Sequence, residues 1–420
     1  MKNWYKLDNA AKIFPGQNSR KWSNAFRMKL SIDEEVKPEI LKTALERVLP
    51  RFPCFAVKLK YGFFWYYFEK NEKSAPPIKE DINNICYRFK YNENDRFLFR
   101  VYYYKNDISV EFFHALTDGN GGTIFACTLV AEYLRISKKI SISTNKFVLD
   151  INEEPKDSEL RDPFSYYCTS KVKAQRSKLN VYHRKSEKMP LHTVSCITGF
   201  LEVDKVLELC REKGVTITEY MSALLIYVHY NIQKRENKHQ KDICAQIPVN
   251  LRRTYNSDTL RNFSMCYQYR MNPNMGEWTF DEILHQLSLY LRYINNEKQL
   301  NAMMKSNIGL EQNPIMKCLP LFIKRAGMFI GFVFTGERST TTLFTNLGVL
   351  SLPEEMKPYI KKAILYAGPG LLNGARVAAV SCGNELALTF ADRYRDHTIE
   401  REFFRELVQR GLHVRIESNV

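Results

Sequence analysis

The sequence lacks several patterns that mark common classes of protein. Its ten cysteines form no C-x-x-C pair, so neither a structural zinc site nor a disulfide framework is expected. No long basic run or recognition motif accompanies the formal net charge of +16, so nucleic-acid binding is not expected. The most apolar stretch, Cys318–Phe334, is broken by Lys324 and Arg325 and falls short of the ~20 residues of a membrane span. The amino terminus has no apolar signal-peptide core, and a cytoplasmic protein is predicted.

Motifs of other enzyme classes are also missing. No G-x-S-x-G sequence occurs, which argues against the strand–helix elbow of a serine hydrolase. The run Gly119–Gly122 lacks the third glycine of a dinucleotide-binding fingerprint, because Ile124 stands in its place. His114 and Asp118 have no third ligand near them in the sequence. No bound metal and no permanently bound cofactor are therefore expected.

The composition supports a large, aromatic-rich core. The chain has 420 residues, 45% of them hydrophobic, with 24 Tyr and 26 Phe, and this length favours two domains of roughly 150–200 residues. Polar residues dominate between Ser141 and Pro190, where periodicity fades. We therefore predict an amino-terminal subdomain at residues 1–180 and a carboxy-terminal subdomain at residues 181–420. The positive charge suits an anionic partner, such as an acidic carrier protein or a phosphorylated cofactor.

Apolar periodicity predicts strands alternating with helices in both halves. In the first half, the expected strands are Phe26–Ile32, Phe55–Leu59, Phe63–Glu69, Phe97–Tyr104 and Ile108–Phe113, and the expected helices are Lys37–Leu49 and a segment from near Gly122 to Leu134. In the second half, the expected strands are Leu191–Leu201, Asp242–Val249, Ser264–Met271, Thr340–Asn346, Arg376–Ser381 and Glu385–Phe390, and the expected helices are Asp204–Lys213, Thr218–Ile232, Thr279–Tyr293 and Thr398–Arg410. The segment from Pro314 to Phe334 is predicted to be helical and largely buried.

The sharpest chemical signal is the stretch from Ser109 to Ile124, where an apolar strand meets a glycine-rich corner. His114 ends the strand, and Asp118 and Gly119 follow in the corner. Acyl transfer from a thioester needs a base for the acceptor's proton, a donor for the oxyanion and two aligned substrates. A histidine suits the base, since its ordinary pKa of ~6.5 leaves it mostly neutral near pH 7. The alternative is a buried strand-end histidine beside an ordinary turn aspartate.

The second half repeats this pattern without the histidine. Glu385–Asp396 is again a strand, a polar corner and the start of a helix, and Ala391 stands where His114 would fall. This indicates two similar α/β halves with the chemistry in one of them.

Three further stretches accompany the H-x-x-x-D-G sequence of the corner. They are residues 37–53 (KPEILKTALERVLPRFP), Pro248–Arg252 followed by Asn262-Phe263, and Thr345–Gly348 followed by Leu352-Pro353. In this order the four resemble the CoA-dependent acyltransferase superfamily, which includes chloramphenicol acetyltransferases, plant BAHD enzymes, wax-ester synthases, alcohol acetyltransferases and peptide-synthetase condensation domains. Alcohol acetyltransferase-like members are the most similar. The D-F-G-W-G sequence of the BAHD branch is absent.

The resemblance implies an α/β fold of two chloramphenicol-acetyltransferase-like subdomains with mixed sheets and a tunnel between them. His114 would act as general base in a ternary complex, with acyl-CoA as co-substrate and an alcohol or amine as acceptor. Asp118 would be structural and would pair with an arginine, for which Arg252 matches the family's position. Gly119 and the glycines after it would leave room for substrate.

The second half would send a loop with Asn346 and Gly348 across the cleft. Thr345 or Ser264 could donate to the oxyanion, or each could be an ordinary strand hydroxyl. Arg253 could replace Arg252 as the partner of Asp118, or Arg252 could be a solvated surface charge. Arg261 stands where the family usually has glycine.

Two alternatives to an acyl-CoA-dependent transferase stay open. The donor could be the phosphopantetheine of an acidic acyl carrier protein, as in a condensation enzyme of secondary metabolism, which the charge of +16 would favour. The chain could also be a binding module that keeps the fold without turnover.

Overall fold

The larger sheet of the protein lies in the second half of the chain. The computed structural model describes residues 4–19, 22–174, 180–236, 240–372 and 375–419. The sheet has seven strands in the order β10-β9-β11-β13-β14-β8-β15. Because β11 runs parallel to β9 and β13 while the other neighbours are antiparallel, the sheet is mixed. Its strands are β8 (Ser195–Glu202), β9 (Ile243–Asn250), β10 (Ser264–Met271), β11 (Thr342–Val349), β13 (Arg376–Cys382), β14 (Glu385–Asp392) and β15 (Arg415–Ser418).

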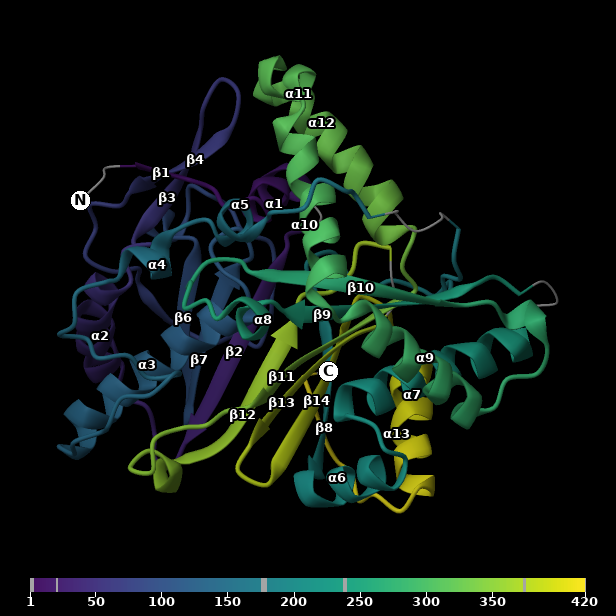
Figure 1. Cartoon of the computed structure of the whole chain (residues 1–420). Helices are drawn as coiled ribbons and strands as arrows, with labels where there is room; N and C mark the ends of the chain where they lie inside the picture. The colour runs from purple at the N-terminus through teal and green to yellow at the C-terminus, as the bar shows by residue number, and fades with distance from the viewer. Residues whose placement is uncertain (1–3, 20–21, 175–179, 237–239, 373–374, 420) are drawn as a thin grey trace.

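The first half contributes most of a second mixed sheet, of five strands in the order β12-β2-β7-β6-β5. Its edge strand β12 comes from the second half and pairs antiparallel with β2, which ties the two halves together (Figure 1). A small third sheet has the order β1-β4-β3. These strands are β1 (Trp4–Lys6), β2 (Ala25–Ile32), β3 (Val57–Tyr61), β4 (Tyr66–Lys70), β5 (Ile78–Glu80), β6 (Phe99–Tyr104), β7 (Asp107–Phe113) and β12 (Ile360–Ala367).

Each half packs helices on its sheet through apolar faces. In the first half, α2 (Pro38–Val48) buries Leu41, Leu45 and Val48 and packs on α3 (Gly119–Lys138), which contacts β2 and β7. In the second half, α7 (Ile217–Glu236) packs on β9 and β11. It is flanked by α9 (Phe280–Ile294) and α13 (Thr398–Gln409). Five further helices of the two halves are α1 (Phe14–Gln17), α4 (Asp157–Leu160), α5 (Pro163–Tyr167), α6 (Val203–Glu212) and α8 (Arg252–Tyr255).

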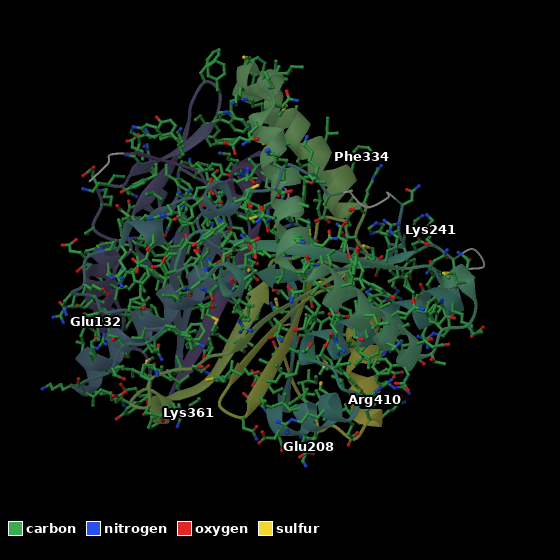
Figure 2. All side chains as sticks on the ribbon, in the orientation of Figure 1. Glu132, Glu208, Lys241, Phe334, Lys361 and Arg410 are labelled. Atoms are coloured by element: carbon green, nitrogen blue, oxygen red, sulfur yellow. The ribbon has the colours of Figure 1, made fainter. Side chains whose placement is uncertain are left out.

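The segment from Pro314 to Phe334 is helical as predicted, but the prediction that it is largely buried is wrong. It forms α11 (Pro314–Cys318), α12 (Leu321–Gly331) and the start of a π-helical turn, and follows α10 (Glu297–Gln312). Figure 1 shows these helices projecting beyond the sheets. Ile315 and Phe322 are 71% and 72% exposed, and Phe334 also reaches the surface (Figure 2). The reason is position: α12 packs on α1 on one side, and in the described part of the chain no sheet covers the outer face of this group, so the apolar residues on that face reach the surface.

The α/β class, with two halves built on mixed sheets, is confirmed. The predicted strands and helices of both halves are present with shifts of a few residues at their ends, whereas β12, β15 and α10 were not predicted from the sequence. The boundary between the two subdomains, placed between residues 180 and 181, stays a prediction. Among the residues described, no helix combines the length and apolarity that crossing a bilayer demands.

Candidate active site

The candidate site lies at the corner between β7 and α3. Phe113 ends β7, and the backbone N–H of His114 donates to the carbonyl of Asn24 at 2.9 Å, which fixes the first residue after the strand. Asp118 is the N-cap of α3, and its Oδ1 accepts from the N–H of Gly121 at 3.2 Å. An aspartate at this position stabilises the start of the helix. Strand end and helix start therefore hold the intervening loop from both sides.

Asp118 forms a buried ion pair with Arg252. The guanidinium donates twice, Nη1 to Oδ2 at 2.8 Å and Nη2 to Oδ1 at 3.0 Å, and the N–H of Phe263 also donates to Oδ2. Burial alone would raise the pKa of Asp118, but Arg252 and the backbone donors hold it below its ordinary value. Of the two arginines considered from the sequence, Arg252 makes this contact, whereas Arg253 is exposed. The pair joins α3 to the segment after β9.

His114 is half-buried and is held by aromatic rings and by one amide. Its ring stacks on Phe14 with centroids 4.6 Å apart and meets the edge of Phe26 at 5.2 Å. Its Nδ1 lies 3.2 Å from Oδ1 of Asn262. Burial lowers the pKa of His114 below its ordinary 6.5, against opposing contributions from a hydrogen bond to its own backbone, from Asp118 and from Asn262. The imidazole is therefore neutral at pH 7.

The orientation of the Asn262 amide determines which nitrogen of His114 carries the hydrogen. Nδ2 of Asn262 donates to Oδ2 of Asp8 at 3.3 Å, so Oδ1 faces the imidazole. A carbonyl oxygen can only accept, so Nδ1 carries the hydrogen and Nε2 keeps its lone pair. A neutral histidine in this tautomer can accept a proton at Nε2.

Asp8 is fully buried and holds the far end of this chain of contacts. Its Oδ1 accepts from the N–H of Ala11 at 2.7 Å, and Arg261 approaches its Oδ2 at 3.5 Å. Burial raises the pKa of Asp8 to about 6, although Arg261 opposes the shift. Sequence reasoning did not single out Asp8, and it noted Arg261 only as a replacement for glycine. The arginine at this position was the one feature of the sequence that pointed to Asp8, because Arg261 is buried and lies against its carboxylate.

The glycines of the corner make close contacts within the protein. A Cβ on Gly121 would lie 2.2 Å from the carbonyl oxygen of Leu260, and a Cβ on Gly119 would lie 3.1 Å from Leu347. The interpretation that the glycines after Gly119 leave room for substrate is therefore wrong for Gly121, because backbone already fills that space. Gly121 allows the second half of the chain to approach α3 closely.

The loop from the second half does reach this corner. Leu347 contacts Gly119, and Gly348 adopts a φ of +79°, a conformation that favours glycine. Oδ1 of Asn346 accepts from the N–H of Gly348 at 2.8 Å, and its Nδ2 donates to Thr218 at 3.2 Å. The amide of Asn346 thus supports the loop.

Thr345 and Ser264 are half-buried on strands of the same sheet. Thr345 lies on β11 and Ser264 on β10, with β9 between them. A role at the oxyanion stays a prediction for each.

Three side chains of kinds that can bind a metal ion lie close together at the second strand–helix corner, between β14 and α13. Ligand atoms of Asp392, His397 and Glu400 lie within 4.8 Å of one another. Burial raises the pKa of both carboxyls, and Asp392 raises that of Glu400 further. Two buried carboxyl groups this close do not readily ionise together, so we expect them to hold a proton between them. The expectation of no bound metal stays a prediction.

Comparison with known proteins gives a match at the level of structure. No protein-family model matches the chain, and no curated protein sequence matches it.

Solved structures match over nearly the whole chain. Fusarium graminearum TRI101, complexed with coenzyme A and deoxynivalenol, is 10% identical, with a TM-score of 0.66 over 98% of this chain and 99% of that one. Polyketide synthase associated protein 5 from Mycobacterium tuberculosis is 13% identical, with a TM-score of 0.61 over 96% of each chain. The starter condensation domain of rhizomide synthetase RzmA, in complex with C8-CoA, is 13% identical, with a TM-score of 0.58 over 96% of this chain and 94% of that one. The fold is thus one that these three proteins share.

Proposed function

We propose that this protein is an acyltransferase that moves an acyl group from acyl-CoA to an alcohol or amine, with His114 as general base in a ternary complex. The observation that carries the proposal is the neutral imidazole of His114, with its Nδ1 directed at Asn262 and its Nε2 free to accept a proton. The fold shared with TRI101 and with condensation domains supports the same class of reaction.

The reaction needs one proton carrier and no enzyme nucleophile. Nε2 of His114 takes the proton of the acceptor O–H or N–H while the acceptor atom bonds to the thioester carbonyl carbon. The tetrahedral intermediate then breaks its C–S bond, and the imidazolium returns the proton to the departing thiolate. The products are an ester or amide and the free thiol of CoA. A tunnel that admits the two substrates from opposite faces belongs to this proposal.

The direct test is to incubate the protein with acyl-CoA and a panel of alcohols and amines, and to follow the release of free thiol. His114→Ala is expected to lower the rate by ~10²–10⁴-fold, the contribution of a positioned base. His413→Ala is the matched control, since His413 is exposed near the end of the chain. An unchanged rate in His114→Ala would contradict the mechanism, and no turnover with any acceptor would favour a binding module.

An acyl carrier protein as donor is the second candidate, and the charge of +16 favours it. An acidic carrier would dock by charge complementarity, so its reaction should slow steeply with added salt. Comparing carrier-bound with CoA-bound acyl groups at two salt concentrations separates the candidates. A faster, salt-sensitive rate with the carrier selects the carrier.

A further inference from the structure

A cavity of about 430 Å³ near the candidate active site has lysine and arginine residues in its lining but no aspartate or glutamate. Five of its twelve lining residues are Lys or Arg and none is Asp or Glu. The five are Lys60, Arg88, Lys90, Arg96 and Arg325. A cavity of this size suits a small-molecule ligand.

The arginines of this cavity lack counter-charges. Lys60 and Lys90 pair with Glu69 and Glu93, neither of which lines the cavity. Within the described part of the chain, Arg88, Arg96 and Arg325 have no carboxylate within ion-pair distance. Nε of Arg88 is moreover buried without a hydrogen-bond partner. Guanidinium groups that line one cavity without carboxylates form an environment suited to an anion.

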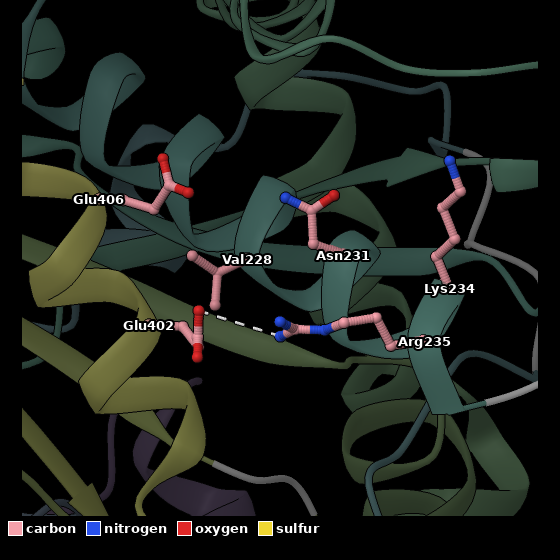
Figure 3. Close-up of a pocket in the computed structure, with 6 residues that line it drawn as sticks. All are labelled: Val228, Asn231, Lys234, Arg235, Glu402 and Glu406. Carbon is pink, nitrogen blue, oxygen red and sulfur yellow. Dashed lines mark ion pairs between the residues drawn. The ribbon is translucent and has the colours of Figure 1, made fainter. Parts of the chain in front are cut away.

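A hollow on another face shows the contrast. The hollow between α7 and α13 is lined by Val228, Asn231, Lys234, Arg235, Glu402 and Glu406 (Figure 3). Its two cations face two carboxylates, and Arg235 lies 3.9 Å from Glu402. High net charge alone therefore does not produce cavities free of acids.

The cationic cavity lies near the candidate active site. Its lining residue Pro15 directly follows Phe14, which stacks on His114. Its lining residue Tyr91 packs on Phe113 with ring centroids 5.4 Å apart, and Phe113 directly precedes His114. The lining of the cavity is thus linked to the proposed base through Phe14 and Phe113.

We propose that this cavity binds a phosphate group carried by one of the two substrates of the acyl transfer. The phosphate belongs either to CoA or to a phosphorylated acceptor, and arginine is the residue best suited to hold it. The assignment of this phosphate to a substrate rests on the proposed function. Binding of phosphate itself is independent of turnover.

Binding is measured first, by titration calorimetry with inorganic phosphate, pyrophosphate, CoA and dephospho-CoA. The test variant is the double substitution Arg96→Gln with Arg325→Gln, since both side chains are exposed and their loss leaves the core intact. The matched control removes two exposed arginines elsewhere, Arg395→Gln with Arg405→Gln. We expect at least a tenfold weaker binding of pyrophosphate in the test variant and no change in the control. Absence of binding to wild type, or equal binding by both variants, overturns the proposal.

Kinetics then assign the phosphate to a substrate. If the KM of acyl-CoA rises in the test variant, the phosphate is that of CoA: the phosphate that dephospho-CoA lacks when the dephospho form shows no such rise, and the pyrophosphate when both forms show it. If the KM of acyl-CoA is unchanged and inorganic phosphate competes with the acceptor, the phosphate belongs to the acceptor. A protein that binds pyrophosphate through these arginines but never releases thiol would retain the site and refute the proposed function.

Discussion

Oδ1 of Asn262 lies 3.2 Å from Nδ1 of His114, although the two residues are 148 positions apart in the chain. Asn262 cannot turn its amide around without losing its bond to Asp8, at 3.3 Å. The buried carboxylate of Asp8 thereby determines the tautomer of a histidine that it does not touch. Correct tautomer and ring orientation are what a third residue supplies to a catalytic histidine in other enzymes.

Asn262→Ala is therefore expected to lower kcat with little change in the KM of acyl-CoA. We expect a loss of about 10–100-fold, the range found when an outer hydrogen-bond partner of a functional histidine is removed. Because Asn262 raises the pKa of His114, its removal should also move the acid limb of the pH profile to lower pH. Asn231→Ala, on the surface of α7 (Figure 3), is the control. A loss of folded protein without a shift of the acid limb in the surviving activity would assign Asn262 a purely structural role.

The pH dependence of wild-type activity follows from the burial of His114. Its pKa lies below 6.5 because burial disfavours the imidazolium. The base must be neutral, so activity should be constant near pH 7 and fall only when the pH drops through a midpoint below 6.5. The measurement is kcat/KM against pH, which reports the pKa values of the free enzyme. A midpoint above 6.5 would contradict the proposed environment of His114.

Much of the corner could be predicted from local sequence, because its parts follow one another along the chain. The end of a strand, a histidine, an N-cap aspartate and a helix are all set by residues within one short segment, so pattern alone located His114 and Asp118. Asp8 could not be found in this way. It lies in a stretch without periodicity, and its contact with Asn262 spans 254 positions.

Two of the sequence-based predictions were wrong for the same physical reason. The sequence pattern of a segment does not say what packs against it. The glycine run favours close approach, but sequence does not tell whether substrate or protein approaches, and at Gly121 it is the carbonyl of Leu260. The apolar residues of α12 favour burial, yet Phe322 is 72% exposed because, among the described residues, no layer covers the outer face of that helix. Lys324 shows the reverse: it is buried, and its Nζ donates to the carbonyl of Phe64 at 3.0 Å.

Removing the partner of Asp118 should cost stability. Arg252→Ala leaves a buried carboxylate with backbone donors alone, and breaking a buried pair in this way costs about 3–5 kcal/mol in the free energy of unfolding. Urea unfolding measures this. Arg253→Ala is the neighbouring control, and as an exposed residue it should stay within about 0.5 kcal/mol of wild type. Equal effects of the two substitutions would mean that Asp118 does not depend on Arg252.

The pair of Glu400 and Asp392 predicts a stability that falls as the pH rises. In the fold the pKa of Glu400 is well above its ordinary value, first because of burial and then because of Asp392, whereas the unfolded chain regains the ordinary value. Between these two pKa values the folded protein holds a proton that the unfolded chain has lost, so the free energy of unfolding decreases with increasing pH.

Glu400→Gln keeps the shape of the side chain and removes the titrating proton, so this variant should gain stability relative to wild type as the pH rises above the ordinary pKa of a glutamate. Urea unfolding at a series of pH values measures the gain, with Glu402→Gln on the same helix as control. The same experiment distinguishes a shared proton from a bound ion at Asp392, His397 and Glu400. With a shared proton, added Zn²⁺ leaves the wild-type curve unchanged. If Zn²⁺ instead stabilised wild type and not Glu400→Gln, the cluster would be a metal site, because only ligand-bearing folded protein gains from a bound ion.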